Sequence, residues 1–208
     1  MNKFLKYGII LLAIGLLAYN SIYIKKLSDV KASSGKKFDA VTYVASLWKD
    51  KLPSRMQVAV DIYTLKTAIE TDAAGAFEKY TNVLAIGNYR YALVKGTAMV
   101  DKVGTDDVTI TINGNTPFKA SLVTEFVYGN AVRDASGIVA LKEFPNTSDL
   151  NSISEEFNKI VRQKVVPAFK PSLKAGDQIE FTGAIELNKE HIHFDDIELV
   201  PLSVKIIP

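Results

Sequence analysis

The chain contains no cysteine among its 208 residues. This absence excludes disulfide bonds, thiolate metal sites and a cysteine nucleophile. It does not restrict the compartment, because a protein without thiols tolerates oxidising and reducing surroundings equally well. Histidine is also scarce, with only two residues in the whole chain.

The common catalytic and nucleotide-binding motifs are missing as well. The sequence has no GxSxG, P-loop, GxGxxG or HExxH pattern. Carboxylates are plentiful, with 23 Asp and Glu residues, but none stands out as an acid/base pair. The sequence therefore predicts neither an enzyme nor a cofactor.

Charge of one sign does not dominate the body of the chain. The formal net charge of +2 arises from 25 Lys and Arg against 23 Asp and Glu. Residues 1–26 contain four lysines and no acidic residue, so residues 27–208 hold 21 basic and 23 acidic side chains. A protein that binds phosphate backbones needs a basic surface. We therefore expect no nucleic-acid partner.

One long apolar run, YGIILLAIGLLAYNSIYI, spans residues 7–24. A helix of this length reaches about 27 Å, close to the roughly 30 Å hydrocarbon core of a bilayer. A cleaved signal peptide and a buried core helix are the alternatives. No small-x-small pair closes the run, so residues 1–26 are predicted to be an uncleaved membrane anchor. Lysines lie on both sides of the run, and charge counting therefore does not settle its orientation.

The segment after the anchor is small, polar and basic, which predicts a juxtamembrane linker over residues 27–37. A helical subdomain is predicted for residues 38–81. Its apolar spacing indicates helices over 38–51, 56–69 and 73–80, and Pro53 is expected to end the first of them.

The hydrophobic period changes from that of helices to that of strands after residue 82. In DVTITI, for example, Val108, Ile110 and Ile112 share one face. The predicted strands are 89–100, with a bulge or bend at Gly96, then 107–112, 117–127, 178–187 and 192–207, the last interrupted at Pro201.

A helix is predicted between the third and fourth strands, over residues 149–165. Asn146 is expected to cap it, Ser152 and Glu155 match a capping box, and Pro167 is expected to end it. Three strands, a helix and two strands form the plan of an OB-fold barrel. The predicted class is therefore α+β: an N-terminal transmembrane anchor and a small helical subdomain packed on an OB-fold-like five-stranded β-barrel over residues 82–208.

The nine residues GNAVRDASG, 129–137, are the first candidate site. Arg133 can bind a carboxylate or phosphate, with Asp134 orienting it and Asn130 and Ser136 adding polar contacts. The alternative is a structural turn between the third strand and the helix, in which Arg133 pairs with Asp134 and the other polar groups satisfy backbone atoms. We predict that this pairing holds the crossover and that ligand contact is secondary.

The stretch HIHFDD, residues 191–196, is the second candidate. On a strand, His191, His193 and Asp195 would project from one face and could bind a divalent metal. The alternative is an exposed strand edge with polar side chains. No further histidine exists to complete a site, so a metal centre is only a weak candidate.

The body of the chain resembles a bacterial family of predicted periplasmic lipoproteins of unknown function with an OB-fold-like barrel. The segments that carry the resemblance are FDAVTYVASLWKDKL, YALVKGTAMV, GNAVRDASG, FPNTSDLNSISEEFNKIV and GDQIEFTGAI. The resemblance implies an extracytoplasmic, membrane-tethered module, encoded beside sugar ABC importers, with no established catalytic residues. A lipoprotein carries its lipid on a cysteine, which this chain lacks, so we expect the uncleaved helix to tether it.

Three functions follow from these observations. The first is a binding or accessory module on the extracytoplasmic side of the membrane, whose partners are the membrane and an ABC importer or its solute-binding protein, with a glycan ligand on the barrel. The second is single-stranded nucleic-acid binding, in which the bases would stack on Tyr89, Tyr91, Phe118, Phe126 and Tyr128. The third is a metal-dependent enzyme that uses the HIHFDD stretch. No oligomeric state is predicted.

Overall fold

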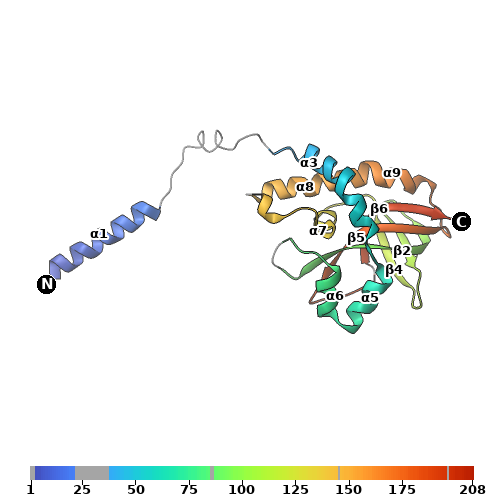
Figure 1. Ribbon diagram of the computed structural model, residues 1–208, viewed down its shortest axis with the longest axis horizontal. Coiled ribbons are helices and arrows are strands. Elements are labelled where there is room, and N and C mark those ends of the chain that lie inside the picture. The colour runs from blue at the N-terminus through green and yellow to red at the C-terminus, as the bar shows by residue number, and fades with distance from the viewer. Residues whose placement is uncertain (1–2, 22–37, 85–86, 145, 196) are drawn as a thin grey trace. The chain divides into compact units, whose positions relative to one another are not determined.

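The computed structural model describes residues 3–21, 38–84, 87–144, 146–195 and 197–208. The chain divides into two compact units, Met1–Phe38 and Asp39–Pro208 (Figure 1). The first unit contains helix α1, Lys3–Ser21. Within the described ranges, no helix is long and apolar enough to cross a membrane. The last residues of the expected anchor and the predicted linker over 27–37 lie outside the described residues.

The second unit is built on a closed five-stranded barrel. Its strands pair in the order β2-β3-β4-β6-β5, and β5 returns to pair with β2. All of these pairs are antiparallel except β4 with β6. The strands are β2 (Tyr89–Val103), β3 (Asp107–Ile112), β4 (Phe118–Val123), β5 (Gln178–Asn188) and β6 (Ile197–Ile207). This strand order, with helices between β4 and β5, is the OB-fold predicted from the sequence.

Alternating apolar side chains fill the barrel. Val108, Ile110 and Ile112 on β3 are at most 1% exposed, as the predicted strand face requires. Their cross-strand neighbours Leu122, Ala120 and Phe118 on β4 are buried too. Burying both sides of each pair removes apolar area from water along the whole barrel, which is the main stabilising contribution of this layer.

Gly96 is neither a bulge nor a break in β2, contrary to the sequence prediction. The pairing of β2 with β5 passes through it without a shift, and the irregularity in β2 lies between Val100 and Lys102, opposite β3. A Cβ at position 96 would lie 3.1 Å from Phe181 Cζ and 3.2 Å from Ile62 Cγ2. The glycine therefore allows a close approach of two buried side chains rather than a bend.

The last strand also differs from its prediction, because β6 begins at Ile197 and continues through Pro201. Gly183 of β5 pairs with Pro201 and Thr182 pairs with Ser203, so Leu202 is an extra residue in the ladder. Proline, which has no N–H to donate, is tolerated in a strand at such a bulge.

The first helix before the barrel does not end at Pro53, contrary to the sequence prediction. The helix α3 (Ala40–Ser46) continues through a π turn, η1 (Leu47–Lys51), into α4 (Leu52–Gln57). The N–H of Leu52 donates to the carbonyl of Leu47, five residues back, immediately before Pro53. The wider turn gives room for the proline ring, which would clash with a backbone carbonyl of the preceding turn in a regular α-helix. The helical run therefore continues past Pro53.

The predicted helix over 56–69 is in fact two elements with a strand between them. The two-residue strand β1 (Val60–Asp61) pairs in parallel with Val94 and Lys95 of β2. Asp61 then caps α5 (Ile62–Thr71) by accepting a hydrogen bond from the N–H of Thr64 at 2.8 Å. The helix α6 (Ala73–Tyr80) matches its predicted bounds.

The helix between β4 and β5 also continues past a proline through a π turn. It comprises α8 (Thr147–Ile160), the π turn η3 (Val161–Val165), α9 (Val166–Phe169) and a final 3₁₀ turn, Lys170–Ser172. Val166 donates its N–H to the Val161 carbonyl just before Pro167, which therefore does not end the run.

Asn146 caps α8 as predicted, with its side-chain oxygen 2.9 Å from the N–H of Asp149. The predicted capping box is wrong, because Ser152 lies inside the helix and donates to the Ser148 carbonyl.

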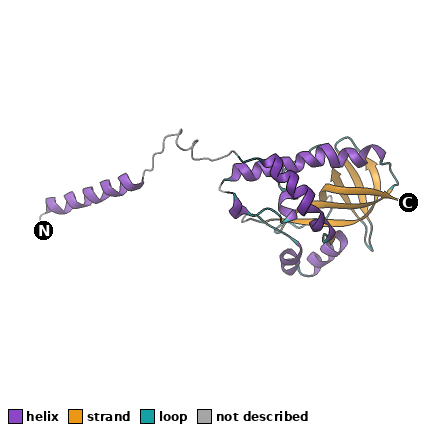
Figure 2. Ribbon diagram, turned by 45° about the horizontal axis from the view of Figure 1, so that its top comes forward, coloured by secondary structure: helices purple, strands orange, loops and turns teal. Residues whose placement is uncertain are grey.

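Figure 2 shows that the helices gather on one side of the barrel and leave the strands on the other side uncovered. The α3 and α8 helices pack together, and the ring of Trp48 lies 6.2 Å from that of the fully buried Phe157. The helices therefore form a layer on the barrel, and part of the strand surface lies outside this layer.

Candidate functional site

The segment GNAVRDASG forms a buried helix, not the turn expected from its sequence. Residues Ala131–Ser136 make helix α7, which packs against β2 and β5, and all six of its residues are buried. Asn130 precedes the helix, and Gly137 ends it with φ = 61°, a left-handed conformation that glycine adopts at little cost.

Arg133 and Asp134 form the ion pair that was predicted. Arg133 Nε donates to Asp134 Oδ1 at 2.6 Å, and Nη2 donates to Oδ2 at 3.1 Å. Arg133 Nη1 also donates to the Leu150 carbonyl of α8 at 3.1 Å. Each residue is only 6% exposed. The pair thus joins α7 to the next helix inside the protein, away from solvent.

The other two polar residues of this segment are also hydrogen-bonded within the protein. Ser136 Oγ donates to the Arg133 carbonyl at 2.7 Å, and Asn130 Oδ1 accepts from Ser154 Oγ at 3.0 Å. No buried side-chain nitrogen or oxygen lacks a partner in the described part of the chain. These contacts favour the structural interpretation of Asn130, Arg133, Asp134 and Ser136. Ligand binding by the four remains an untested prediction.

Tyr91 on β2 lies close to this ion pair. Burial raises the pKa of its phenol strongly, and the negative charge of Glu186 and hydrogen bonding to it raise the pKa further. The phenol is therefore neutral across the physiological pH range.

The second candidate, HIHFDD, does not have the geometry on which the metal hypothesis depended. His191, His193 and Asp195 lie in the connection between β5 and β6, not on a strand, and all three are exposed. Among the residues with described positions, no three His, Cys, Asp or Glu side chains gather as a metal site.

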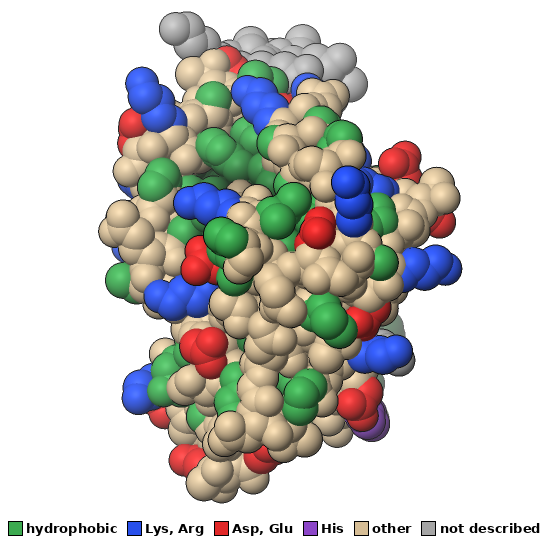
Figure 3. All heavy atoms as spheres, turned by 90° about the vertical axis from the view of Figure 1, so that its right-hand side faces the viewer, with side chains coloured by type: hydrophobic (Ala, Val, Ile, Leu, Met, Phe, Trp, Pro, Cys, Tyr) green, Lys and Arg blue, Asp and Glu red, His purple; other side chains and the backbone are tan. Residues whose placement is uncertain are grey.

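The aromatic residues proposed to stack nucleic-acid bases do not form one surface. Tyr91 and Phe118 are 8% and 7% exposed, and Phe118 packs edge-on against Phe194 at 6.0 Å. Phe126 and Tyr128 are exposed and stack on each other at 6.4 Å. On the face shown in Figure 3, acidic and basic side chains are interspersed rather than gathered in a basic patch.

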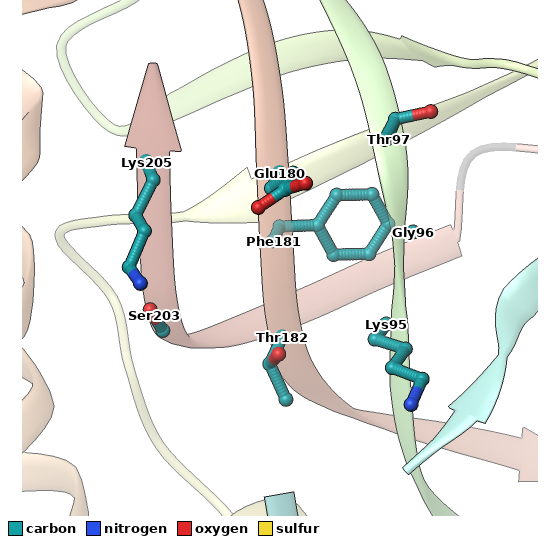
Figure 4. A pocket seen from close by; sticks show the side chains of 8 residues that line it. All are labelled: Lys95, Gly96, Thr97, Glu180, Phe181, Thr182, Ser203 and Lys205. Atoms are coloured by element: carbon teal, nitrogen blue, oxygen red, sulfur yellow. The ribbon is translucent and has the colours of Figure 1, made fainter. Parts of the chain in front are cut away.

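A groove on the outer face of the barrel was not predicted. It has a volume of about 340 Å³ and crosses three neighbouring strands, β2, β5 and β6 (Figure 4). Its outward-facing side chains form two rows, and each row crosses the three strands. One row contains Lys95, Thr182 and Ser203, and the other contains Thr97, Glu180 and Lys205. Helix α7 packs against β2 and β5 and leaves these strand segments uncovered.

The side chains of this outer groove combine donors and acceptors. Two ammonium groups donate, the Glu180 carboxylate accepts, and three hydroxyls can do either. Lys95 Nζ is held by the Gln57 carbonyl at 3.0 Å, which fixes one donor. The ring of Phe181 points toward Gly96 at the base (Figure 4). The arrangement suits a small ligand rich in hydroxyl groups, because each hydroxyl both donates and accepts.

The barrel order and the helices between β4 and β5 define the class of the protein, an OB-fold protein with an added helical layer. The chain belongs to the family of predicted periplasmic lipoproteins (DUF2291), whose model matches residues 12–205. It is similar to the crystal structure of an OB-fold protein from Thermotoga maritima MSB8 at 1.90 Å resolution. The two are 26% identical, with a TM-score of 0.73 over 83% of this chain and 100% of that one. A search of curated proteins found no match.

Proposed function

We propose that the protein is a membrane-anchored, extracytoplasmic binding module that serves a sugar ABC importer or its solute-binding protein. Membership of a family of predicted periplasmic lipoproteins supports the compartment. The apolar run over residues 7–24 supports the anchor, since these 208 residues hold no cysteine that could carry a lipid. The sugar importer enters through the resemblance of the sequence to proteins encoded beside such transporters.

The outer groove is the observation that carries the binding function. Its two rows of polar side chains come from three strands of a rigid barrel, so their spacing is fixed by main-chain pairing. Lysine and glutamate placed on neighbouring strands can bind adjacent hydroxyls of a sugar ring, one as donor and the other as acceptor. The ligand class that fits the groove is a neutral saccharide.

Exchange of Glu180 for glutamine is expected to weaken saccharide binding by about tenfold, because a charged hydrogen-bond acceptor is replaced by a neutral one. The measurement is isothermal titration of residues 39–208 with a panel of neutral mono- and oligosaccharides. Glu198→Gln is the matched control, since Glu198 is exposed on β6 and lies outside the groove. Absence of heat with every saccharide, or equal affinity in the two variants, would refute the groove as the binding site.

Crosslinking in living cells tests the anchor and the partner together. The full-length protein is expected to sediment with membranes and to crosslink to an importer subunit or a solute-binding protein. A chain that lacks residues 1–26 is expected to leave the membrane fraction, because the rest of the chain has no comparable apolar run. Recovery of cytoplasmic proteins alone would contradict both the topology and the importer association.

A further inference from the structure

A second cavity lies where the helical layer meets α7, and the outer groove shares no residue with it. It has a volume of about 240 Å³ and includes the side chains of Arg55, Lys79 and Asn82. Residues from α4, α6 and α7 contribute to its walls, so segments distant in sequence build one pocket.

Arg55 is held in place on one edge of its guanidinium. Its Nε donates to the Ser136 carbonyl at 2.8 Å, at the end of α7. Within the described residues, its Nη1 and Nη2 groups make no hydrogen bond or ion pair with protein. An arginine fixed in this way presents a preorganised pair of N–H groups.

Gly137 lies beside Arg55, and its lack of a side chain leaves space next to the guanidinium. A Cβ on Gly137 would lie 3.3 Å from Arg55 Nη2 and 3.2 Å from Asn82 Oδ1. Asn82 is oriented in turn by its Nδ2, which donates to the Ala135 carbonyl at 2.8 Å. The polar contacts of α7 therefore position both side chains at the pocket.

The charge of the pocket has one sign. Its described walls contain the cations Arg55 and Lys79 and no Asp or Glu. Lys79 extends over the ring of Tyr80, with Nζ 4.8 Å from the centroid, and forms no ion pair among the residues with described positions. Two cations without a carboxylate between them favour an anionic ligand.

The geometry points to a binding site for a small oxyanion, a phosphate or carboxylate group, held by Nη1 and Nη2 of Arg55 with Lys79 as the second positive charge. The guanidinium fork matches two oxygens of such a group, and the ammonium supplies a point charge beside it. Tyr80 and Thr81 line the same pocket and can contact the remainder of a small molecule.

Titration calorimetry of the full-length protein in detergent micelles tests this site, with inorganic phosphate and succinate as separate probes. Wild-type protein is expected to bind at least one of the two, more weakly at higher salt. Arg55→Lys is expected to weaken binding about tenfold or more, because the fork is lost. Lys79→Gln is expected to weaken it roughly two- to fivefold, as befits an exposed charge. Which probe binds identifies the phosphate or the carboxylate as the ligand group.

Lys164→Gln is the charge-matched control, because Lys164 is an exposed lysine of η3 outside the pocket. Thermal melts identify any variant that fails to fold. If Arg55→Lys does not fold, the affinity of Lys79→Gln alone tests the oxyanion site. No heat with either probe, or the same loss in Lys164→Gln as in Lys79→Gln, overturns the site. Saccharide binding at the outer groove is measured separately with Glu180→Gln. Failure of the oxyanion site can therefore be told apart from failure of the saccharide site.

Discussion

Replacement of Arg133 by alanine is expected to lower the free energy of unfolding by about 3 to 5 kcal/mol, because Asp134 is left as an uncompensated buried charge. Both residues are 6% exposed, so water cannot replace the lost hydrogen bonds without opening the structure. The Leu150 carbonyl loses its hydrogen bond from Arg133 Nη1 in the same variant. Denaturant unfolding of residues 39–208 measures the change, and the melting temperature should fall by roughly 10 °C.

A double variant separates the ion pair from general damage to α7. Arg133→Met combined with Asp134→Leu removes both charges and keeps much of the volume, so it is expected to lose far less stability than either single substitution. A double variant as unstable as Arg133→Ala would contradict the assignment of the cost to the unpaired charge. Unchanged stability of Arg133→Ala with lost partner or ligand binding would favour the functional interpretation of this segment.

Gly183→Ala is expected to destabilise the barrel by about 2 to 3 kcal/mol through overpacking. A Cβ there would overlap Leu199 Cδ2 and would lie 2.7 Å from the carbonyl oxygen of Val200. The leucine can rotate, but the carbonyl belongs to the neighbouring strand beside the β6 bulge and cannot move without disturbing the ladder. Thermal unfolding of residues 39–208 should show a loss of roughly 4 to 10 °C.

Two other glycines calibrate this result. A Cβ at position 96 would lie near side-chain carbons only, at 3.1 and 3.2 Å. Gly96→Ala is therefore expected to lower the free energy of unfolding less than Gly183→Ala does. Gly87→Ala meets nothing within 4 Å and is expected to be neutral or nearly so. Equal effects at positions 183 and 87 would show that the crowding against β6 is not the cause.

The barrel could be predicted because its signals are local. Alternation of apolar residues in a strand depends on neighbours two residues apart, and β3 accordingly has its predicted bounds. The apolar period of a helix is equally local, and α6 also has its predicted bounds. The continuation of the helices past Pro53 and Pro167 could not be predicted from the proline rule. A π turn before each proline adds a hydrogen bond between residues five apart, and no residue type marks it.

The sites were harder to predict than the fold. Polar residues in GNAVRDASG favour an exposed turn by composition, yet Arg133 and Asp134 neutralise each other and are buried together. The outer groove depends on pairing of Lys95 with Thr182, and the second cavity depends on Arg55 reaching Ser136. Such contacts join residues more than 80 positions apart, and a single sequence contains no pattern that reports them.

Closure of the barrel also constrains when the protein can fold. Strand β2 pairs with β5 along its length from Tyr89, opposite Asn188, to Met99, opposite Gln178. A nascent chain that has completed β4 therefore has an open edge on β2 and another on β4, and it holds these edges until the C-terminal strands are synthesised. Pairing over such sequence separations is slow. Closure of the barrel is therefore expected only after β5 and β6 have been synthesised.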